Sequence, residues 1–261
     1  MKQTISSIQK AKGNRKLTMI TAYDALFAKL FDEQVDFILV GDSLNMSFAG
    51  KPDTLSATLD QMIYHTNAVC NGAANTFVIC DMPFGTYTNE KDAIKNCTKV
   101  FKKTNASAVK IEGGSSKAHI VKALTTHSIA VCGHIGLMPQ NFRSEGGYKV
   151  KGKDEDNIKT LIQDAIDIEK AGAFALVVEG VKEDAASQIT AAVNIPVIGI
   201  GAGVKVDGQV LVWSDMLGFF EEFKPKFVRQ YLDGASLVRD AVSTYKNDVE
   251  DLSFPAEQEK Y

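Results

Sequence analysis

Apolar and polar positions divide the chain into short apolar runs and longer segments with a helical spacing of apolar residues. The short runs are rich in β-branched residues, as strands buried on both faces are. Eight of them follow one another along the chain: LTMITA from Leu17, FILVGD from Phe37, FVICDMPF from Phe77, AVKIEGG from Ala108, IAVCGHIG from Ile129, FALVVEG from Phe174, PVIGIGAG from Pro196 and, less clearly patterned, VLVW from Val210.

The segments between these runs have the spacing of amphipathic helices, and glycine, asparagine or proline lies near most of their ends. They include residues 58–74, 90–105, 154–171 and 183–192. Buried strands that are each followed by a helix indicate a parallel sheet, and eight such units predict a closed (β/α)8 TIM barrel of the α/β class. A doubly wound open sheet is the alternative fold.

Chain length is compatible with a single domain, because one α/β barrel routinely reaches the 261 residues found here. Residues 1–261 are therefore expected to form one barrel domain, with a helical extension before the first strand. The short charged tail from Lys246 is expected to be poorly ordered.

Composition favours a soluble protein that acts on small molecules. The formal net charge is −3 with acids and bases interspersed, so there is no basic stripe for nucleic acid. No apolar run approaches the roughly 18 residues that a membrane span needs. The polar N-terminus lacks an apolar signal core, which predicts a cytoplasmic protein. The 4 cysteines show no Cys-x-x-Cys spacing and are expected to be reduced.

Polar residues stand at the ends of five adjacent predicted strands. In a (β/α)8 barrel these ends meet at one rim, where the active site is built. One such residue could simply cap a helix or begin a turn, but five adjacent strands that end this way predict a common site. Asp42 ends the second strand, Asp81 the third, Lys110 and Glu112 bracket the end of the fourth, His134 follows the fifth and Glu179 closes the sixth.

Three of these acids predict a metal site. Asp42, Asp81 and Glu112 offer only hard oxygen donors, which favour Mg²⁺ or a similar divalent ion over zinc or a redox metal. Such an ion could chelate a 2-oxo acid and stabilise the enolate formed when a neighbouring C–H loses its proton. Lys110 would add a second positive charge at the same place.

Glu179 differs from the other acids because it follows the apolar run AFALVV. That run is expected to desolvate its carboxylate and make it a better proton acceptor, whereas carboxylates on a metal stay ionised. Two environments for the acids imply two roles, and Glu179 is the candidate general base.

Seven segments of the sequence carry a family resemblance that covers essentially the whole chain. They resemble the 3-methyl-2-oxobutanoate hydroxymethyltransferase family, also called ketopantoate hydroxymethyltransferases. The match extends from TISSIQKAK near the start to SFPAEQEKY at the end. The segments are MITAYDALFAKLFDEQVDFILVGDSLNM, TLDQMIYHTNAV, CDMPFGTY, AVKIEGG, VCGHIGLMPQ, GGYKVKGK and IGIGAGVKVDGQVLVWSDMLG.

The resemblance implies a (β/α)8 barrel that transfers a hydroxymethyl group from the co-substrate 5,10-methylenetetrahydrofolate to 3-methyl-2-oxobutanoate. It also implies a homo-oligomer, the family-typical decamer. The residues that match the family's functional positions are Asp42, Asp81 and Glu112 for magnesium, Asp42, Ser43, Asp81 and Lys110 for the oxo acid, Glu179 as proton acceptor and His134 in the substrate pocket.

Two other functions are compatible with such a barrel. A Mg²⁺-dependent C–C lyase or mutase of the isocitrate lyase and phosphoenolpyruvate mutase type would share the acids, but the Lys-Lys-Cys-Gly-His segment of those lyases is absent, since VCGHIGL lacks the lysines. A non-catalytic barrel is the third possibility, because fold alone does not guarantee function. No candidate acid is missing, which favours an enzyme.

Overall fold

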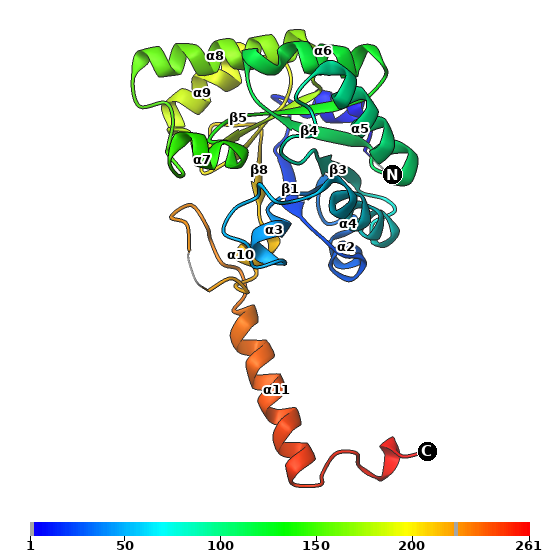
Figure 1. Cartoon of the computed structure of the whole chain (residues 1–261). Helices are drawn as coiled ribbons and strands as arrows, with labels where there is room; N and C mark the ends of the chain where they lie inside the picture. The colour runs from blue at the N-terminus through cyan, green and yellow to red at the C-terminus, as the bar shows by residue number, and fades with distance from the viewer. Residues whose placement is uncertain (1–2, 222–223) are drawn as a thin grey trace. The chain divides into compact units, whose positions relative to one another are not determined.

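The computed structural model describes residues 3–221 and 224–261. The chain divides into two compact units, Met1–Val212 and Trp213–Tyr261. The extent of a single domain over residues 1–261 stays a prediction. Figure 1 shows the strands at the centre of the first unit, with helices around them.

Eight parallel strands close into a barrel in chain order, which confirms the (β/α)8 fold and excludes the open, doubly wound sheet. Every predicted strand is present, and the weakly patterned eighth one starts two residues before Val210. The strands are β1 Leu17–Thr21, β2 Phe37–Val40, β3 Phe77–Asp81, β4 Ala108–Glu112, β5 Val131–Gly136, β6 Ala175–Glu179, β7 Val197–Ile200 and β8 Gly208–Leu211.

Capping side chains fix where the long helices begin. Thr58 accepts from the Gln61 backbone and Gln61 reaches back, which completes a capping box, and Asn89 and Asp154 cap two later helices. The four predicted helical segments are confirmed. The helices of the first unit are α1 Ile5–Ala11, α2 Ala25–Phe31, α3 Leu44–Ser47, α4 Leu59–Gly72, α5 Glu90–Lys103, η1 Ser115–Lys117, α6 Ala118–Thr126, η2 Pro139–Asn141, α7 Phe142–Glu145, α8 Glu155–Lys170 and α9 Glu183–Ala192.

The barrel interior is filled by side chains that alternate along the strands. Phe37, Phe77 and Phe174 pack edge to face or tilted near the N-terminal ends of their strands, with centroids 5.8 and 5.5 Å apart. Ile8 and Ala11 of α1 belong to the same buried cluster, so the expected N-terminal helical extension joins the core. The barrel is a packed core below its C-terminal rim.

An ion pair at the N-terminal end of the barrel ties α1 to the strands. Lys12 Nζ lies 2.7 Å from Asp207 Oδ2 and also donates to the Thr190 carbonyl. The same Asp207 oxygen accepts from the Val197 backbone N–H at 2.9 Å, so one carboxylate joins the start of β7 to α1.

Replacing that carboxylate is expected to lower stability without touching the rim. Asp207→Asn removes the charge that both donors use, and hydrogen bonds to charged groups are worth about 1.5–3 kcal/mol each. We expect the free energy of unfolding, measured by urea denaturation, to fall by roughly 1–3 kcal/mol. An unchanged midpoint would contradict this role for Asp207.

The second unit contains α10 Trp213–Met216, α11 Gly234–Glu250 and η3 Glu257–Glu259. Residues from Lys246 onward, expected to be poorly ordered, continue α11 to Glu250 and then form η3. Val238, Val242, Tyr245 and Val249 follow one another at helical spacing along α11, and all are exposed within the chain.

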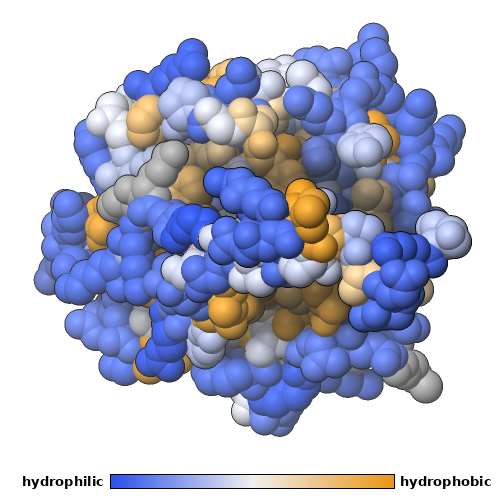
Figure 2. Space-filling view, turned by 90° about the horizontal axis from the view of Figure 1, so that it is seen from below, coloured by the Kyte–Doolittle hydropathy of each residue, from blue (hydrophilic) through white to orange (hydrophobic). Residues whose placement is uncertain are grey.

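The four cysteines are free, as expected, and all are buried. The face drawn in Figure 2 is mostly hydrophilic, with hydrophobic side chains in small groups between the polar ones. Among residues 3–221 and 224–261, no helix combines the length and the apolar character that a bilayer span requires.

Candidate functional site

Strand alternation carries the polar side chains to the C-terminal rim of the barrel. Ile79 lies in the core cluster, so Asp81, two residues later in β3, points the same way. Strand register then sets neighbours side by side, because Asp81 pairs with Lys110 and Glu112 pairs with His134. By the same alternation Lys110, Glu112, His134 and Glu179 face the rim, and Asp42 follows β2.

Burial makes this a cluster of high electrostatic energy. Asp42 and Asp81 are each 3% exposed, and Lys110 and Glu112 are each 5% exposed. With Glu179, four carboxylates face the ammonium of Lys110 and the imidazolium of His134, a formal excess of two negative charges, which is costly away from water. A divalent cation would balance that excess.

Asp42 and Asp81 lie next to each other, and Lys110 neutralises only one of them. The Asp42 backbone N–H donates to Asp81 Oδ2 at 3.1 Å, while Lys110 Nζ lies 3.1 Å from Asp81 Oδ1. Burial first, and then the charges of Asp81 and Glu112, raise the pKa of Asp42 well above its ordinary value. Burial likewise raises the pKa of Asp81, although Lys110 opposes the shift.

The lysine itself is held in its charged form. Burial lowers the pKa of Lys110, but the carboxylates of Asp81, Glu112 and Asp42 outweigh burial, so the net direction is upward. Lys110 Nζ also lies 3.0 Å from His134 Nδ1. The rim therefore carries a permanent positive charge beside its acids.

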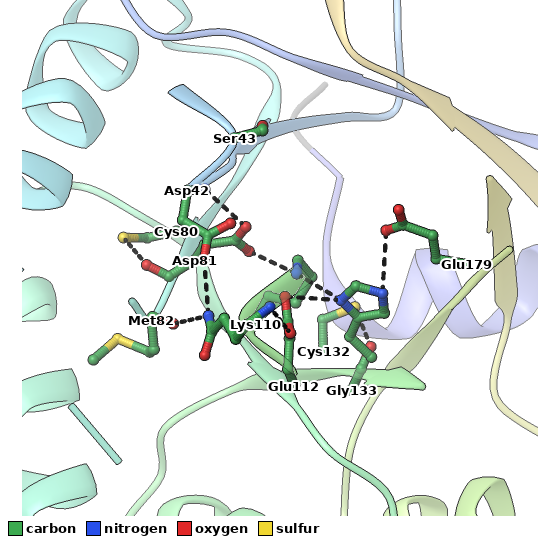
Figure 3. Close-up of polar contacts among 12 residues, drawn as sticks. Asp42, Ser43, Cys80, Asp81, Met82, Lys110, Glu112, Cys132, Gly133 and Glu179 are labelled. Atoms are coloured by element: carbon green, nitrogen blue, oxygen red, sulfur yellow. Dashed lines mark hydrogen bonds and ion pairs between the residues drawn. The ribbon is translucent and has the colours of Figure 1, made fainter. Parts of the chain in front are cut away.

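His134 lies between two glutamates, Glu112 and Glu179, both of which are labelled in Figure 3. Its Nδ1 lies 3.5 Å from Glu112 Oε1, and its Nε2 lies 3.3 Å from Glu179 Oε2. Burial and Lys110 oppose the imidazolium, but Glu112 and Glu179 favour it, and the pKa of His134 is raised to about 9. Burial raises the pKa of Glu112, but His134, Lys110 and the Gln140 backbone N–H together outweigh burial, so the net direction is downward.

Glu179 is the most accessible acid of the group. Its side chain is 20% exposed, against 5% for Asp81 and 4% for Glu112. The apolar run before Glu179 is buried as expected, yet its carboxylate reaches the open end of the barrel. A substrate at the rim could meet it directly.

Ser43 stands beside the acids at the start of α3. Its hydroxyl lies 2.8 Å from the Tyr23 hydroxyl. A Cβ on Gly41 would lie 2.7 Å from Ser43 Oγ and 3.6 Å from an Asp81 oxygen, so glycine lets the backbone pass closely here. Asp42 and Ser43 are thereby presented from one short turn.

Gln140 contacts two of the acids and Tyr87 contacts Gln140, and the sequence interpretation had assigned neither residue. Gln140 Nε2 donates to Asp42 Oδ2 at 2.9 Å, and its backbone N–H donates to Glu112 Oε2 at 3.1 Å. The hydroxyl of Tyr87 donates to Gln140 Oε1. The signal available in the sequence was their position in loops after the third and fifth strands, which end at the same rim.

The carboxylate oxygens at the rim are the type of donor that a hard cation prefers. Asp81 Oδ1 is buried without a hydrogen bond of good geometry among the described residues, although Lys110 pairs with it. In the described part of the chain, no three Asp, Glu, His or Cys side chains stand close enough together to enclose a metal ion. The Glu112 carboxylate contacts His134, whereas the Asp81 carboxylate accepts from the Asp42 backbone N–H.

Sequence comparison finds relatives along the whole chain. Residues 2–257 match the family model described as ketopantoate hydroxymethyltransferase. The 3-methyl-2-oxobutanoate hydroxymethyltransferase of Aliarcobacter butzleri is 71% identical over 260 residues, covering 100% of this chain and 97% of the relative. The protein of the same name from Sulfurimonas denitrificans is 65% identical over 260 residues, covering 100% of this chain and 99% of the relative.

Solved structures share the barrel at low sequence identity. Phosphonopyruvate hydrolase has a TM-score of 0.63 at 15% identity, over 99% of this chain and 93% of that one. A second structure of it, in complex with oxalate and Mg++, has a TM-score of 0.60 at 14% identity, over 98% and 92%. These likenesses support the fold alone. The lyase and mutase interpretation is therefore limited to a shared architecture.

Proposed function

Because this chain belongs to the ketopantoate hydroxymethyltransferase family, we propose that it makes 2-dehydropantoate from 3-methyl-2-oxobutanoate. The hydroxymethyl group comes from 5,10-methylenetetrahydrofolate and water, and tetrahydrofolate leaves. Such a protein is an enzyme of pantothenate biosynthesis. The observation that carries the chemistry is the buried, net acidic cluster at the rim, with a more exposed glutamate beside it.

Mg²⁺ is the cation proposed for this cluster, held by Asp42 and Asp81 with Glu112 as the third acid. Hard carboxylate donors and a formal excess of two negative charges support that choice. When bound, Mg²⁺ supplies Lewis-acid stabilisation of the enolate oxygen. Glu112 is engaged by His134 and by the Gln140 backbone, so it contributes mainly negative charge.

The oxo acid is proposed to bind against Ser43, Lys110 and His134, in addition to the two aspartates. Lys110 is held charged by three carboxylates and is suited to a carboxylate or enolate oxygen. Ser43 offers a hydroxyl beside Asp42. His134 is only 2% exposed, so its main contribution is to orient Glu179, whose carboxylate lies 3.3 Å from its Nε2.

Glu179 is the proposed general base. It would take the proton from C3 of 3-methyl-2-oxobutanoate, and the electron pair of the broken C–H bond would form the enolate. Water would release the one-carbon unit of the folate as formaldehyde, with both of its C–N bonds broken and tetrahydrofolate leaving. The enolate carbon would then attack the formaldehyde carbon, and the oxygen would take up a proton to complete the hydroxymethyl group. Glu179 suits this step because it is not engaged with the aspartate pair and its carboxylate reaches the open end of the barrel.

The function is tested by product formation. Purified protein is incubated with 3-methyl-2-oxobutanoate and 5,10-methylenetetrahydrofolate, with Mg²⁺ or after thorough chelation, and 2-dehydropantoate is followed by mass spectrometry. We expect product only when Mg²⁺ and both substrates are present. The absence of product under all these conditions would refute the proposed function.

Lys110→Met is expected to reduce turnover sharply while the protein stays folded. Methionine keeps much of the apolar stem but removes the charge proposed to stabilise the enolate, and one such electrostatic contact is worth about 10²–10³-fold in kcat. Steady-state kinetics measures the loss. Unchanged turnover and unchanged KM for the oxo acid would reduce Lys110 to a packing residue.

A homo-oligomer is also proposed, of the decameric kind that the family resemblance suggests. The exposed apolar stripe of α11, formed by Val238, Val242, Tyr245 and Val249, supports contact with a second copy of this chain. Light scattering after gel filtration measures the assembly. A monomer at micromolar concentration would contradict it.

A further inference from the structure

Tyr87 and Gln140 are buried polar residues to which the proposed chemistry gives no role. Tyr87 is 5% exposed in the loop after β3, and Gln140 is 7% exposed in η2, after β5. Both loops open onto the rim that carries the acids. Buried polar groups cost free energy unless they are paired, so their contacts show what they do there.

Every polar group of the Gln140 side chain has a partner. Nε2 donates to Asp42 Oδ2 at 2.9 Å and to the Met82 carbonyl at 3.0 Å, while Oε1 accepts from the Tyr87 hydroxyl. An amide turned over would set its oxygen against the Asp42 carboxylate. The Tyr87 proton therefore selects the orientation in which the amide donates to Asp42.

Tyr87 is suited to that task because it stays a donor. Burial, and then the charges of Glu112 and Asp42, raise the pKa of Tyr87 well above its ordinary value. Lys117 Nζ lies 5.6 Å from the centre of its ring and helps to hold it. The phenol is thus fixed in position and in protonation.

Gln140 also reaches a second acid through its backbone. Its N–H donates to Glu112 Oε2 at 3.1 Å, so one residue contacts carboxylates that follow β2 and end β4. A neutral donor stabilises an ionised carboxylate without adding a positive charge that would repel a cation. At Asp81 the partner is charged instead. The Lys110 ammonium pairs with Asp81 Oδ1 and would compete with a cation for that oxygen.

We infer that Tyr87 and Gln140 are positioning residues, which together turn the Asp42 carboxylate toward a divalent cation and keep it there. The inference rests on the cation site of the proposed function. Outer partners of this kind typically affect metal affinity by about 10–100-fold when they are lost.

The test is a titration of the full-length protein with Mn²⁺ alone, in which electron paramagnetic resonance measures the free ion and no substrate is present. Tyr87→Phe and Gln140→Leu are each expected to raise the Kd about 10–100-fold. Tyr148→Phe is the matched control, because it also loses a phenol oxygen, one that contacts Met46 Sδ at 3.6 Å instead of Gln140. Its Kd is expected to equal that of the wild type.

A double variant separates positioning from general loosening of the fold. Because Tyr87 acts through the Gln140 amide, the double variant is expected to have the same Kd for Mn²⁺ as Gln140→Leu alone. If the two residues acted independently, the fold-increases in Kd of the single variants would multiply. Thermal unfolding without Mn²⁺ checks that each variant folds. If Gln140→Leu does not fold, the test rests on Tyr87→Phe, which removes only one oxygen.

Three results would each overturn the inference. They are wild-type Mn²⁺ affinity in Tyr87→Phe, additive losses of binding free energy in the double variant, and no Mn²⁺ binding by the wild type. The readout requires no turnover. A wild type that binds Mn²⁺ but forms no 2-dehydropantoate would refute the proposed function and leave the positioning role standing.

Discussion

Asp42→Asn is expected to lose turnover by about 10²–10⁴-fold, because the charge stabilisation that a metal gives a transition state is worth several kcal/mol. Asparagine keeps the shape of the side chain and an oxygen that can accept from Gln140, but it loses the negative charge that would hold Mg²⁺. Steady-state kinetics with added Mg²⁺ measures the loss. Near-native turnover after thorough chelation and return of Mg²⁺ would rule out Asp42 as a ligand.

Thermal unfolding gives the same variant a second readout. Burial among other acids raises the pKa of Asp42, so its ionised form costs stability in the metal-free protein. Asp42→Asn is therefore expected to melt at a higher temperature than the metal-free wild type. Mg²⁺ is expected to raise the melting temperature of the wild type and to leave that of the variant unchanged.

Asp207→Asn is the control for these measurements. It makes the same chemical change at a buried aspartate, but at the N-terminal end of the barrel, where Asp207 pairs with Lys12. We expect lower stability with wild-type turnover and a normal response to Mg²⁺. A matching loss of turnover in Asp207→Asn would mean that the effect at Asp42 reports on folding.

Glu179→Gln is expected to lose turnover by about 10²–10⁴-fold, the usual contribution of a general base. Glutamine keeps the size of the side chain and can still contact His134, but it is a very poor proton acceptor. Mg²⁺-dependent binding of 3-methyl-2-oxobutanoate, measured by calorimetry, is expected to stay close to that of the wild type. The change should therefore appear in kcat rather than in affinity.

If Glu179→Gln retained turnover, another group would have to be the general base. His134 is the candidate, because its Nε2 lies 3.3 Å from the Glu179 carboxylate at the same rim. Against it, the ring is 2% exposed and is contacted by Lys110 and Glu112 on its other side. The double variant with His134→Gln would then show whether the remaining activity depends on the imidazole.

The fold could be predicted from the sequence because strand and helix patterns differ strongly along this chain. Runs such as Phe37–Val40 and Val197–Ile200 are apolar throughout, as strands covered on both faces must be. Thr58 and Asp154 marked helix starts through their side chains. The eighth strand was the weakest prediction because it contains Gly208 and Gln209, which lack the β-branched pattern.

The site could be predicted only in part, because sequence shows which residues reach the rim but not how they pair there. Strand ends gave Asp81, Lys110 and Glu179 their common location. Pairing depends on register and side-chain direction, so the turn of Glu112 toward His134 emerged only from the structure. Gln140 carries no charge, so its position in the loop after the fifth strand indicated the rim but not its contact with Asp42.

Exchange of the C3 hydrogen of 3-methyl-2-oxobutanoate with deuterated solvent tests the central claim most directly, because enolisation precedes any transfer from the folate. Proton NMR follows the exchange with Mg²⁺ present, and with tetrahydrofolate added if the site must close first. We predict exchange by the wild type that requires Mg²⁺ and is abolished in Glu179→Gln. Exchange in Glu179→Gln at the wild-type rate would contradict the account.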